Sequence, residues 1–199
     1  MAKTATGMVV ATLAVLFASW AQAASSDSMV TGGRTTQPIG HYGFCQREPQ
    51  ECQQKTSNTR PAELSRKLWA EMIGVNNAVN TKVTPQTDEE TWGREEYWSY
   101  PDKVGDCEDY VLEKRRELMN YGIPASDLLI TVVRQPNGDG HAVLTVRTSN
   151  GDYILDNLEP RVLAWRETVY TYLKRQSETN SGAWVSISDG HATAVGSVR

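Results

Sequence analysis

Three short runs rich in β-branched and apolar residues follow one another in the second half of the chain. They cover residues 128–135, 141–148 and 153–156. A turn at residues 136–140 (Pro-Asn-Gly-Asp-Gly) separates the first two runs, and the hairpin signal Asn150-Gly151 separates the second from the third. The sequence therefore predicts an antiparallel meander.

A helix-like run at residues 108–119 comes directly before this meander and has start and stop signals at its ends. Asp106 suits the N-cap, and Asp109 suits the capping-box position from which an acid reaches back to the amide of the cap. Gly122 suits the C-terminal cap. Cys107 then occupies the first helical position. A helix followed by antiparallel strands predicts an α+β fold.

A second, amphipathic helix is expected upstream, beginning near Pro61 and continuing to Asn80. We interpret its apolar stripe as core packing, and Trp69 beside it as a packed residue. The stripe consists of Leu64, Leu68, Met72, Val75 and Val79.

The acid-rich residues 81–103 are expected to connect the two helices and to contain a short helical turn. Their aromatic side chains either pack over the start of the helix that follows Cys107 or shape a substrate groove. After the meander, we expect a loop with a helical turn at residues 165–175 and a short strand at residues 184–187.

The first 23 residues have the pattern of a secretory signal peptide. Lys3 precedes an apolar core at residues 8–17, and Ala21-Gln22-Ala23 matches the small-residue cleavage pattern. The alternative is a membrane anchor, but a spanning segment needs roughly 20 apolar residues and this run is shorter. We therefore expect an exported protein, periplasmic or secreted, that does not span a membrane once the signal is removed.

The remaining chain is expected to form one domain. Residues 24–40 are polar and predict a flexible lead-in, residues 41–190 the globular domain, and residues 191–199 a loose tail. The chain carries 20 basic and 24 acidic side chains, a formal net charge of −4. Because there is no basic excess, we expect no nucleic-acid partner.

The sequence contains three cysteines, an odd number for an exported protein. Cys45 and Cys52 are close enough to close a small loop by a disulfide in an oxidising compartment, which leaves Cys107 as a candidate reactive thiol. A zinc site is the alternative, but its ligands have no compact spacing. Those ligands would be the cysteines with His41, His141 and His191.

Cys107 is a candidate nucleophile because of its position at the start of a helix. Unpaired backbone N–H groups and the helix macrodipole favour a thiolate there and should lower the pKa of the thiol. The alternative is a small buried cysteine that follows a cap. A thiolate also needs a base, and the base needs a group that orients it.

His141 at the start of one expected strand and Asp156 at the end of the next could supply these two groups. A turn centred on Asn150-Gly151 offsets the two residues by four positions, so either a bulge or a stagger of the strands would be needed to join them. Each also has an ordinary interpretation, His141 as a strand-end residue bonded to a turn carbonyl and Asp156 as part of a turn.

Three motifs make the chain recognisable: Gly105-Asp106-Cys107-Glu108-Asp109-Tyr110, Gly140-His141-Ala142-Val143-Leu144 and Leu155-Asp156-Asn157-Leu158. Together they resemble the bacterial transglutaminase-like cysteine peptidases, a family that includes periplasmic adhesin-processing proteases. The resemblance covers most of the chain from about residue 45 to residue 187. It implies a papain-like, transglutaminase-like core, in which the nucleophile begins a helix packed on an antiparallel sheet.

The resemblance also implies the roles of the site residues. Cys107 would be the nucleophile, His141 the general base and then acid, and Asp156 the residue that orients His141, with a thioester acyl-enzyme as intermediate. In the adhesin-processing members, acids that flank the cysteine are associated with calcium, which here points to Asp106, Glu108 and Asp109. The alternative is that Asp106 and Asp109 only cap the helix.

The expected partner is a protein or peptide substrate, with a cell-surface adhesin as one candidate; no loop is distinctive enough to assign it. Two other functions remain open. An amine could compete with water for the thioester, which would give transglutaminase-type acyl transfer. A calcium-responsive binding module with a vestigial triad is the second.

Overall fold

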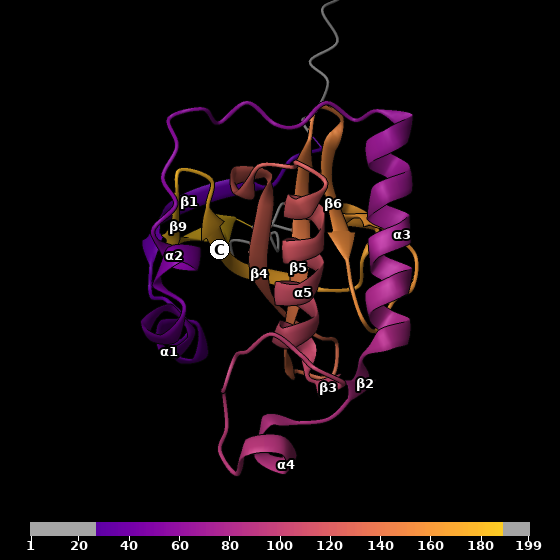
Figure 1. Ribbon diagram of the computed structural model, residues 1–199. Helices are drawn as coiled ribbons and strands as arrows, with labels where there is room; N and C mark the ends of the chain where they lie inside the picture. The colour runs from indigo at the N-terminus through magenta and orange to yellow at the C-terminus, as the bar shows by residue number, and fades with distance from the viewer. Residues whose placement is uncertain (1–26, 189–199) are drawn as a thin grey trace, which may run out of the picture.

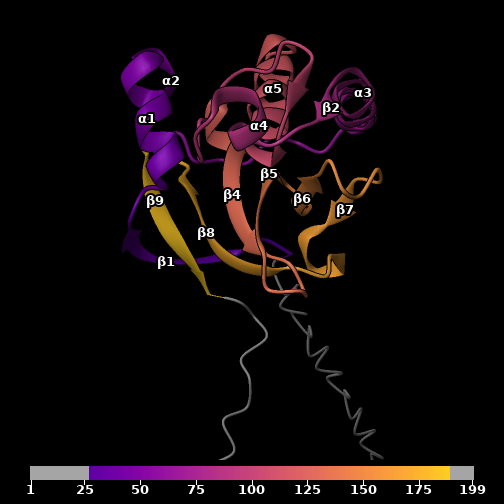
Figure 2. The same ribbon diagram turned by 90° about the horizontal axis from the view of Figure 1, so that it is seen from below.

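A seven-stranded antiparallel sheet forms the framework of the computed structural model, which describes residues 27–188. The strand order is β1-β9-β8-β4-β5-β6-β7 (Figures 1 and 2). The strands are β1 (Val30–Thr35), β4 (Leu128–Arg134), β5 (Gly140–Thr148), β6 (Gly151–Leu155), β7 (Leu163–Ala164), β8 (Thr171–Ser177) and β9 (Asn180–Ser188). The expected meander is β4-β5-β6.

The α-helices gather on one face of this sheet (Figure 2). They are α1 (Ile39–Arg47), α2 (Pro49–Cys52), α3 (Arg66–Lys82), α4 (Asp88–Trp92) and α5 (Cys107–Asn120). Helix α5 packs on β4 and β5, α3 lies beside α5, and α2 contacts β9. A short parallel pair, β2 (Thr84–Pro85) and β3 (Val104–Gly105), precedes α5. The α+β prediction is confirmed.

The core lies between α5, α3 and the sheet. Leu112 and Leu118 of α5 are almost completely buried, as are Ile130 of β4 and Leu144 of β5. Met72 of α3 is also buried in this cluster. Because the first turn of α5 is continuous with this core, the position of Cys107 is set by packing along the whole helix.

Helix α3 begins later than expected. Its N-cap is Ser65, whose hydroxyl accepts the backbone N–H of Leu68 at 3.1 Å. The expected start, near Pro61, lies in extended chain instead. There, the Ala62 carbonyl accepts the N–H of Ser149 at 2.8 Å, so the segment is held along the sheet rather than wound into the helix.

The flexible lead-in expected at residues 24–40 is wrong for residues 30–35, which form strand β1. This strand pairs with β9 at the edge of the sheet. Five of its six residues are exposed, so its stability comes from backbone hydrogen bonds and it has no alternating apolar pattern to signal a strand. Buried Met29 anchors its start, since its N–H donates to Asp152 Oδ2 at 2.8 Å.

Residues 171–175 were expected to be part of a loop, but they belong to β8, which lies between β4 and β9. The helical turn at Trp165–Glu167 and the loop at residues 168–170 match the expectation. Two polar side chains of β8 are buried and paired. Arg175 contacts Asp152, and the amide oxygen of Gln176 accepts the N–H of Ile130. Because β8 is rich in polar residues, its sequence lacks the apolar pattern that predicts a strand inside a sheet.

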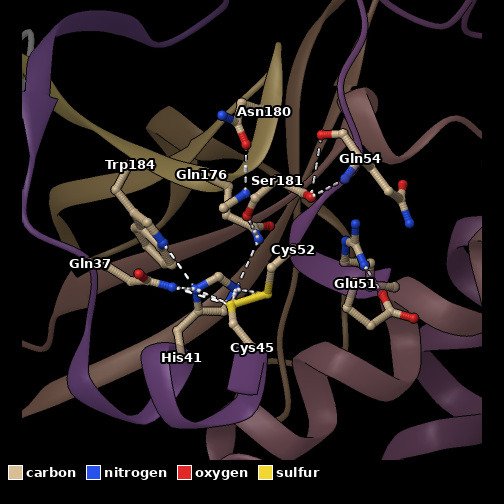
Figure 3. Close-up of a disulfide and its surroundings, with 12 residues drawn as sticks. Gln37, His41, Cys45, Glu51, Cys52, Gln54, Gln176, Asn180, Ser181 and Trp184 are labelled. Carbon is tan, nitrogen blue, oxygen red and sulfur yellow. Dashed lines mark hydrogen bonds and ion pairs between the residues drawn. A yellow bond between two sulfur atoms is a disulfide. The ribbon is translucent and has the colours of Figure 1, made fainter. Parts of the chain in front are cut away.

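Cys45 and Cys52 form the expected disulfide, which joins α1 to α2 (Figure 3). His41 lies against it, fully buried, and Trp184 Nε1–H donates to His41 Nδ1 at 3.2 Å. Burial and nearby Arg115 lower the pKa of His41 to about 4, so the ring is neutral. Both sulfur atoms are used in the disulfide, which leaves them unavailable as zinc ligands.

The signal peptide expected at residues 1–23 and the tail expected at residues 191–199 lie outside the described residues. Within residues 27–188, no helix has the length and apolar character needed to cross a membrane.

Candidate active site

Cys107 is the first residue of α5, as predicted, and Asp106 is the N-cap residue. The Asp106 side chain makes no cap hydrogen bond, however. Asp109 points to the segment before the helix, where its Oδ1 accepts the backbone N–H of Ser99 at 2.7 Å. Burial raises the pKa of Asp109 to about 8, although the backbone N–H groups of Ser99 and Asp106 favour its charged form. Asp109 thus fastens the connection to the start of α5.

The thiol of Cys107 donates a hydrogen bond to Glu108 Oε2 at 3.2 Å. Burial raises the pKa of the thiol well above its ordinary value, and the charge of Glu108 raises it further. A hydrogen bond with the backbone of Ala142, on β5, acts in the opposite direction. The expectation of a lowered thiol pKa is therefore wrong for the protein without a bound cation, because desolvation and adjacent carboxylates outweigh the helix terminus.

His141 and Asp156 lie side by side and are buried. His141 Nε2 is 2.8 Å from Asp156 Oδ1. Thr148 pairs with Gly151, so the hairpin loop is one residue earlier than expected. Continued beyond β6, this regular register places Asp156 opposite Val143, with His141 two residues further along the same face. Side chains at such diagonal positions can touch, so the strands are staggered and no bulge is needed.

Asp156 has further partners on its backbone and side chain. Its Oδ1 accepts the N–H of Leu158 at 3.0 Å, its Oδ2 accepts the Tyr170 hydroxyl at 2.5 Å, and its carbonyl accepts Asn80 Nδ2 at 2.8 Å. Burial alone would raise the pKa of Asp156, but hydrogen bonds from His141, Leu158 and Tyr170 and the charge of His141 lower it. Asp156 is therefore a carboxylate at neutral pH.

Cys107 and His141 line the same open groove, which has a volume of about 330 Å³. Its lining combines the chain around β2 and α4 with residues near the ends of β4 and β6. The lining residues include Gln86, Thr87, Glu90, Gln135, Asn157 and Leu158. A peptide laid in this groove would meet the thiol and the imidazole together.

Three carboxylates form a cluster beside the thiol. Asp88 of α4, Asp106 and Glu108 each offer an oxygen within 4.8 Å of the others. Burial is the main cause that raises the pKa of Asp106, and burial together with Asp106 raises that of Glu108 to about 9. Asp106 Oδ1 is buried and has no hydrogen-bond partner among the described residues. Hard oxygen ligands with an unsatisfied buried oxygen fit a calcium ion.

The cluster differs from the expected ligand set in two ways. Asp88 was not predicted as a ligand, because it lies 18 residues before Asp106. It is also the first residue of α4, a position where acids are common because they stabilise the helix N-terminus. Asp109 was expected to join Asp106 and Glu108, but its carboxylate accepts from Ser99 and is not part of the cluster.

A cysteine that begins a helix, packed on an antiparallel sheet that carries a His–Asp pair, defines the transglutaminase-like cysteine peptidases as a class. Comparison with known families agrees. Residues 31–192 match the family described as bacterial transglutaminase-like cysteine proteinase, BTLCP, and the chain belongs to this family.

Solved structures of Legionella pneumophila LapG are similar to this chain. The calcium-bound form is 26% identical over 62% of this chain and 71% of its own, with a TM-score of 0.51. A second LapG structure is 23% identical over 75% and 81% of the two chains, and the EGTA-treated form 21% identical over 80% and 87%, both with a TM-score of 0.51. No curated protein sequence matches the chain.

Proposed function

We propose that this chain is an exported cysteine peptidase that hydrolyses a peptide bond in a protein substrate, with Cys107, His141 and Asp156 as its catalytic triad. The observation that supports it most is the buried His141–Asp156 pair at 2.8 Å, together with the position of His141 in the groove that Cys107 also lines. The family and the fold support the same reaction class.

The hydrogen bond to Asp156 assigns the two nitrogens of His141. Because the Asp156 carboxylate accepts a hydrogen bond from Nε2–H, which keeps its proton, Nδ1 is left to take the proton of the Cys107 thiol. The thiolate then attacks the peptide carbonyl carbon, and the imidazolium returns the proton to the leaving amine. The resulting thioester is hydrolysed by a water molecule that His141 deprotonates, which regenerates the thiol.

The carbonyl oxygen becomes negatively charged during this attack and needs hydrogen-bond donors. Helix α5 leaves its first N–H groups without partners inside the helix, and Cys107 is the first of these residues. We propose that backbone N–H groups at this terminus stabilise the oxyanion.

Calcium is the proposed cofactor, held by Asp88, Asp106 and Glu108. Calcium needs six to eight oxygen ligands, so loop carbonyls and water would complete its coordination. When bound, it supplies positive charge beside the thiol. This charge offsets the carboxylates that raise the pKa of Cys107. The calcium-bound and EGTA-treated forms of the similar LapG support this choice.

Residues 1–23 support export, and a periplasmic or secreted location follows from them. The substrate would then be a protein met outside the cytoplasm, with a cell-surface adhesin as one candidate.

Alkylation with iodoacetamide tests the nucleophile, since Cys107 is the only cysteine outside the disulfide. In calcium at pH 6, where an ordinary thiol is mostly protonated, we expect the wild type to react at least about tenfold faster than His141→Ala. Asp156→Asn should also slow the reaction, and the control Asp139→Asn, in an exposed turn, should not. Equal rates in wild type and His141→Ala would refute the triad.

Hydrolysis itself is tested on the surface proteins of the producing bacterium. They are incubated with the wild type or with Cys107→Ser in calcium, and new protein N-termini are identified by mass spectrometry. New termini produced only by the wild type are expected. Amide crosslinks without new termini would favour acyl transfer instead.

A further inference from the structure

Tyr170 lies in the loop between the turn Trp165–Glu167 and β8, 14 residues after Asp156 and outside the three sequence motifs. We infer that Tyr170 is a positioning residue of the active site, which fixes the Asp156 carboxylate through its hydroxyl and limits the orientation of His141 through its ring. This inference rests on the proposed triad.

The first observation is how the donors are shared between the two oxygens of Asp156. Oδ1 receives His141 Nε2–H at 2.8 Å and Leu158 N–H at 3.0 Å, while Oδ2 receives only the Tyr170 hydroxyl, at 2.5 Å, among the described residues. A carboxylate with donors on both oxygens cannot rotate without breaking bonds on both sides. Without the tyrosine hydroxyl, the Oδ2 side would be free.

The second observation concerns the strength and permanence of that bond. A hydroxyl that donates to a carboxylate at this distance makes a charge-assisted hydrogen bond, the strong kind in proteins. Burial raises the pKa of Tyr170 far above its usual value, and the hydrogen bond and charge of Asp156 raise it further. Tyr170 therefore keeps its proton, and remains a donor, over the whole pH range in which the enzyme could work.

The third observation is that Tyr170 also contacts the imidazole. The ring centroids of Tyr170 and His141 are 5.5 Å apart and tilted by 53°. His141 thus has the carboxylate at one nitrogen and an aromatic ring beside it, and both constraints involve Tyr170. Rotation of the imidazole away from the groove would lose both contacts.

The loop itself is held in place next to the sheet. The Thr168 hydroxyl donates to the Trp165 carbonyl at 2.8 Å and is 2.9 Å from the Tyr172 hydroxyl. Trp165 is buried, and its indole packs edge-on against Tyr172 at 5.3 Å between centroids. Tyr170 can position Asp156 only from a fixed loop, since a tyrosine on a mobile loop would not hold the carboxylate in one orientation.

Tyr170→Phe is the decisive variant, because it keeps the ring and removes only the hydroxyl. Tyr172→Phe is the matched control. It removes a hydroxyl that lies 2.9 Å from the Thr168 hydroxyl, two residues from Tyr170, and it keeps the Tyr170 hydroxyl that donates to Asp156. Both variants are compared with the wild type in calcium, with thermal unfolding recorded to measure any loss of stability.

Two readouts separate positioning from packing. Proton NMR of protein labelled with ¹⁵N-histidine, assigned with His141→Ala, reports the Nε2–H proton that His141 donates to Asp156. The iodoacetamide rate of Cys107 reports the competence of the triad. For Tyr170→Phe we expect the Nε2–H resonance to shift or broaden. We also expect the alkylation rate to fall about tenfold, which is the size of effect typical when a hydrogen-bond partner that orients a functional histidine is removed. For Tyr172→Phe we expect neither change.

A double-mutant cycle completes the test. If Tyr170 acts through Asp156, then Tyr170→Phe should have little further effect on the rate in an Asp156→Asn background. An unchanged resonance and rate in Tyr170→Phe, or a full tenfold effect in the Asp156→Asn background, would overturn the inference. These failures are distinct from failure of the triad, in which His141→Ala itself would leave the Cys107 rate unchanged.

Discussion

Substitution of Asp88 by asparagine should have opposite effects on the protein with and without calcium. Asp88 is buried, and its carboxylate lies within 4.8 Å of the oxygens of Asp106 and Glu108. Two unit charges at this separation repel each other by about 1 kcal/mol in water and about 3.5 kcal/mol at an effective dielectric constant of 20. Asp88→Asn removes two of the three repulsions and keeps an oxygen that can accept the Tyr97 N–H.

Protonation already relieves part of this repulsion, because burial and Asp106 raise the pKa of Glu108 to about 9. We therefore expect the calcium-free variant to be more stable than the wild type by about 1 kcal/mol, which raises Tm by about 2–4 °C. With saturating calcium the effect reverses. A loss of about 100-fold in affinity removes about 2.7 kcal/mol of linked stabilisation, or about 5–10 °C of the calcium-induced shift.

Differential scanning fluorimetry in EGTA and in a calcium series measures both effects. Asp109→Asn is the control, since its carboxylate accepts from Ser99 and lies outside the cluster. We expect Asp109→Asn to leave the calcium-induced shift in Tm within about 2 °C of that of the wild type, because its calcium affinity should change little. A lower calcium-free Tm for Asp88→Asn would refute the repulsion argument. A normal calcium shift for Asp88→Asn, with the shift lost in Asp109→Asn, would refute the assignment of ligands.

Three further predictions concern stability. Lys114 is buried and its Nζ has no hydrogen-bond partner among the described residues; burial lowers its pKa to about 7. Because the unfolded chain then binds more protons between pH 7 and about 10.4, stability should rise with pH in this window. Lys114→Met should abolish this rise and stabilise the protein at pH 7 by about 1–3 kcal/mol. Urea unfolding at several pH values measures both effects, and a rise that persists in the variant would exclude Lys114 as its source. Gly40→Ala should lower the free energy of unfolding by about 1–3 kcal/mol, because the added Cβ would overlap the Trp98 ring; an unchanged urea midpoint would contradict this packing. Replacing Cys45 and Cys52 by serine should lower the free energy of unfolding by about 2 kcal/mol, because the disulfide no longer closes a loop in the unfolded chain. Reduction of the wild type with dithiothreitol should reproduce that loss in the same urea assay.

Local sequence signals were sufficient for the elements that carry the site. The meander at residues 128–156 and the helix that begins at Cys107 were both predicted, because hairpin turns, β-branched runs and helix caps act between near neighbours in the chain. The same local rules failed at β1 and β8. In those strands, the stabilising contacts come from backbone pairing and from buried polar side chains whose partners are distant in sequence.

The sequence by itself determined which residues are available for chemistry and which elements carry them: Cys107 on a helix, His141 and Asp156 on neighbouring strands. Only the tertiary structure decided how they meet. A hairpin loop one residue earlier brings Asp156 diagonally opposite His141, α4 brings Asp88 to Asp106, and the loop before β8 brings Tyr170 to Asp156. The physical reason is that a hydrogen bond or an ion cluster depends on ångström-scale separations between side chains. Those separations are set by strand register and by the packing of distant segments, which no local propensity encodes.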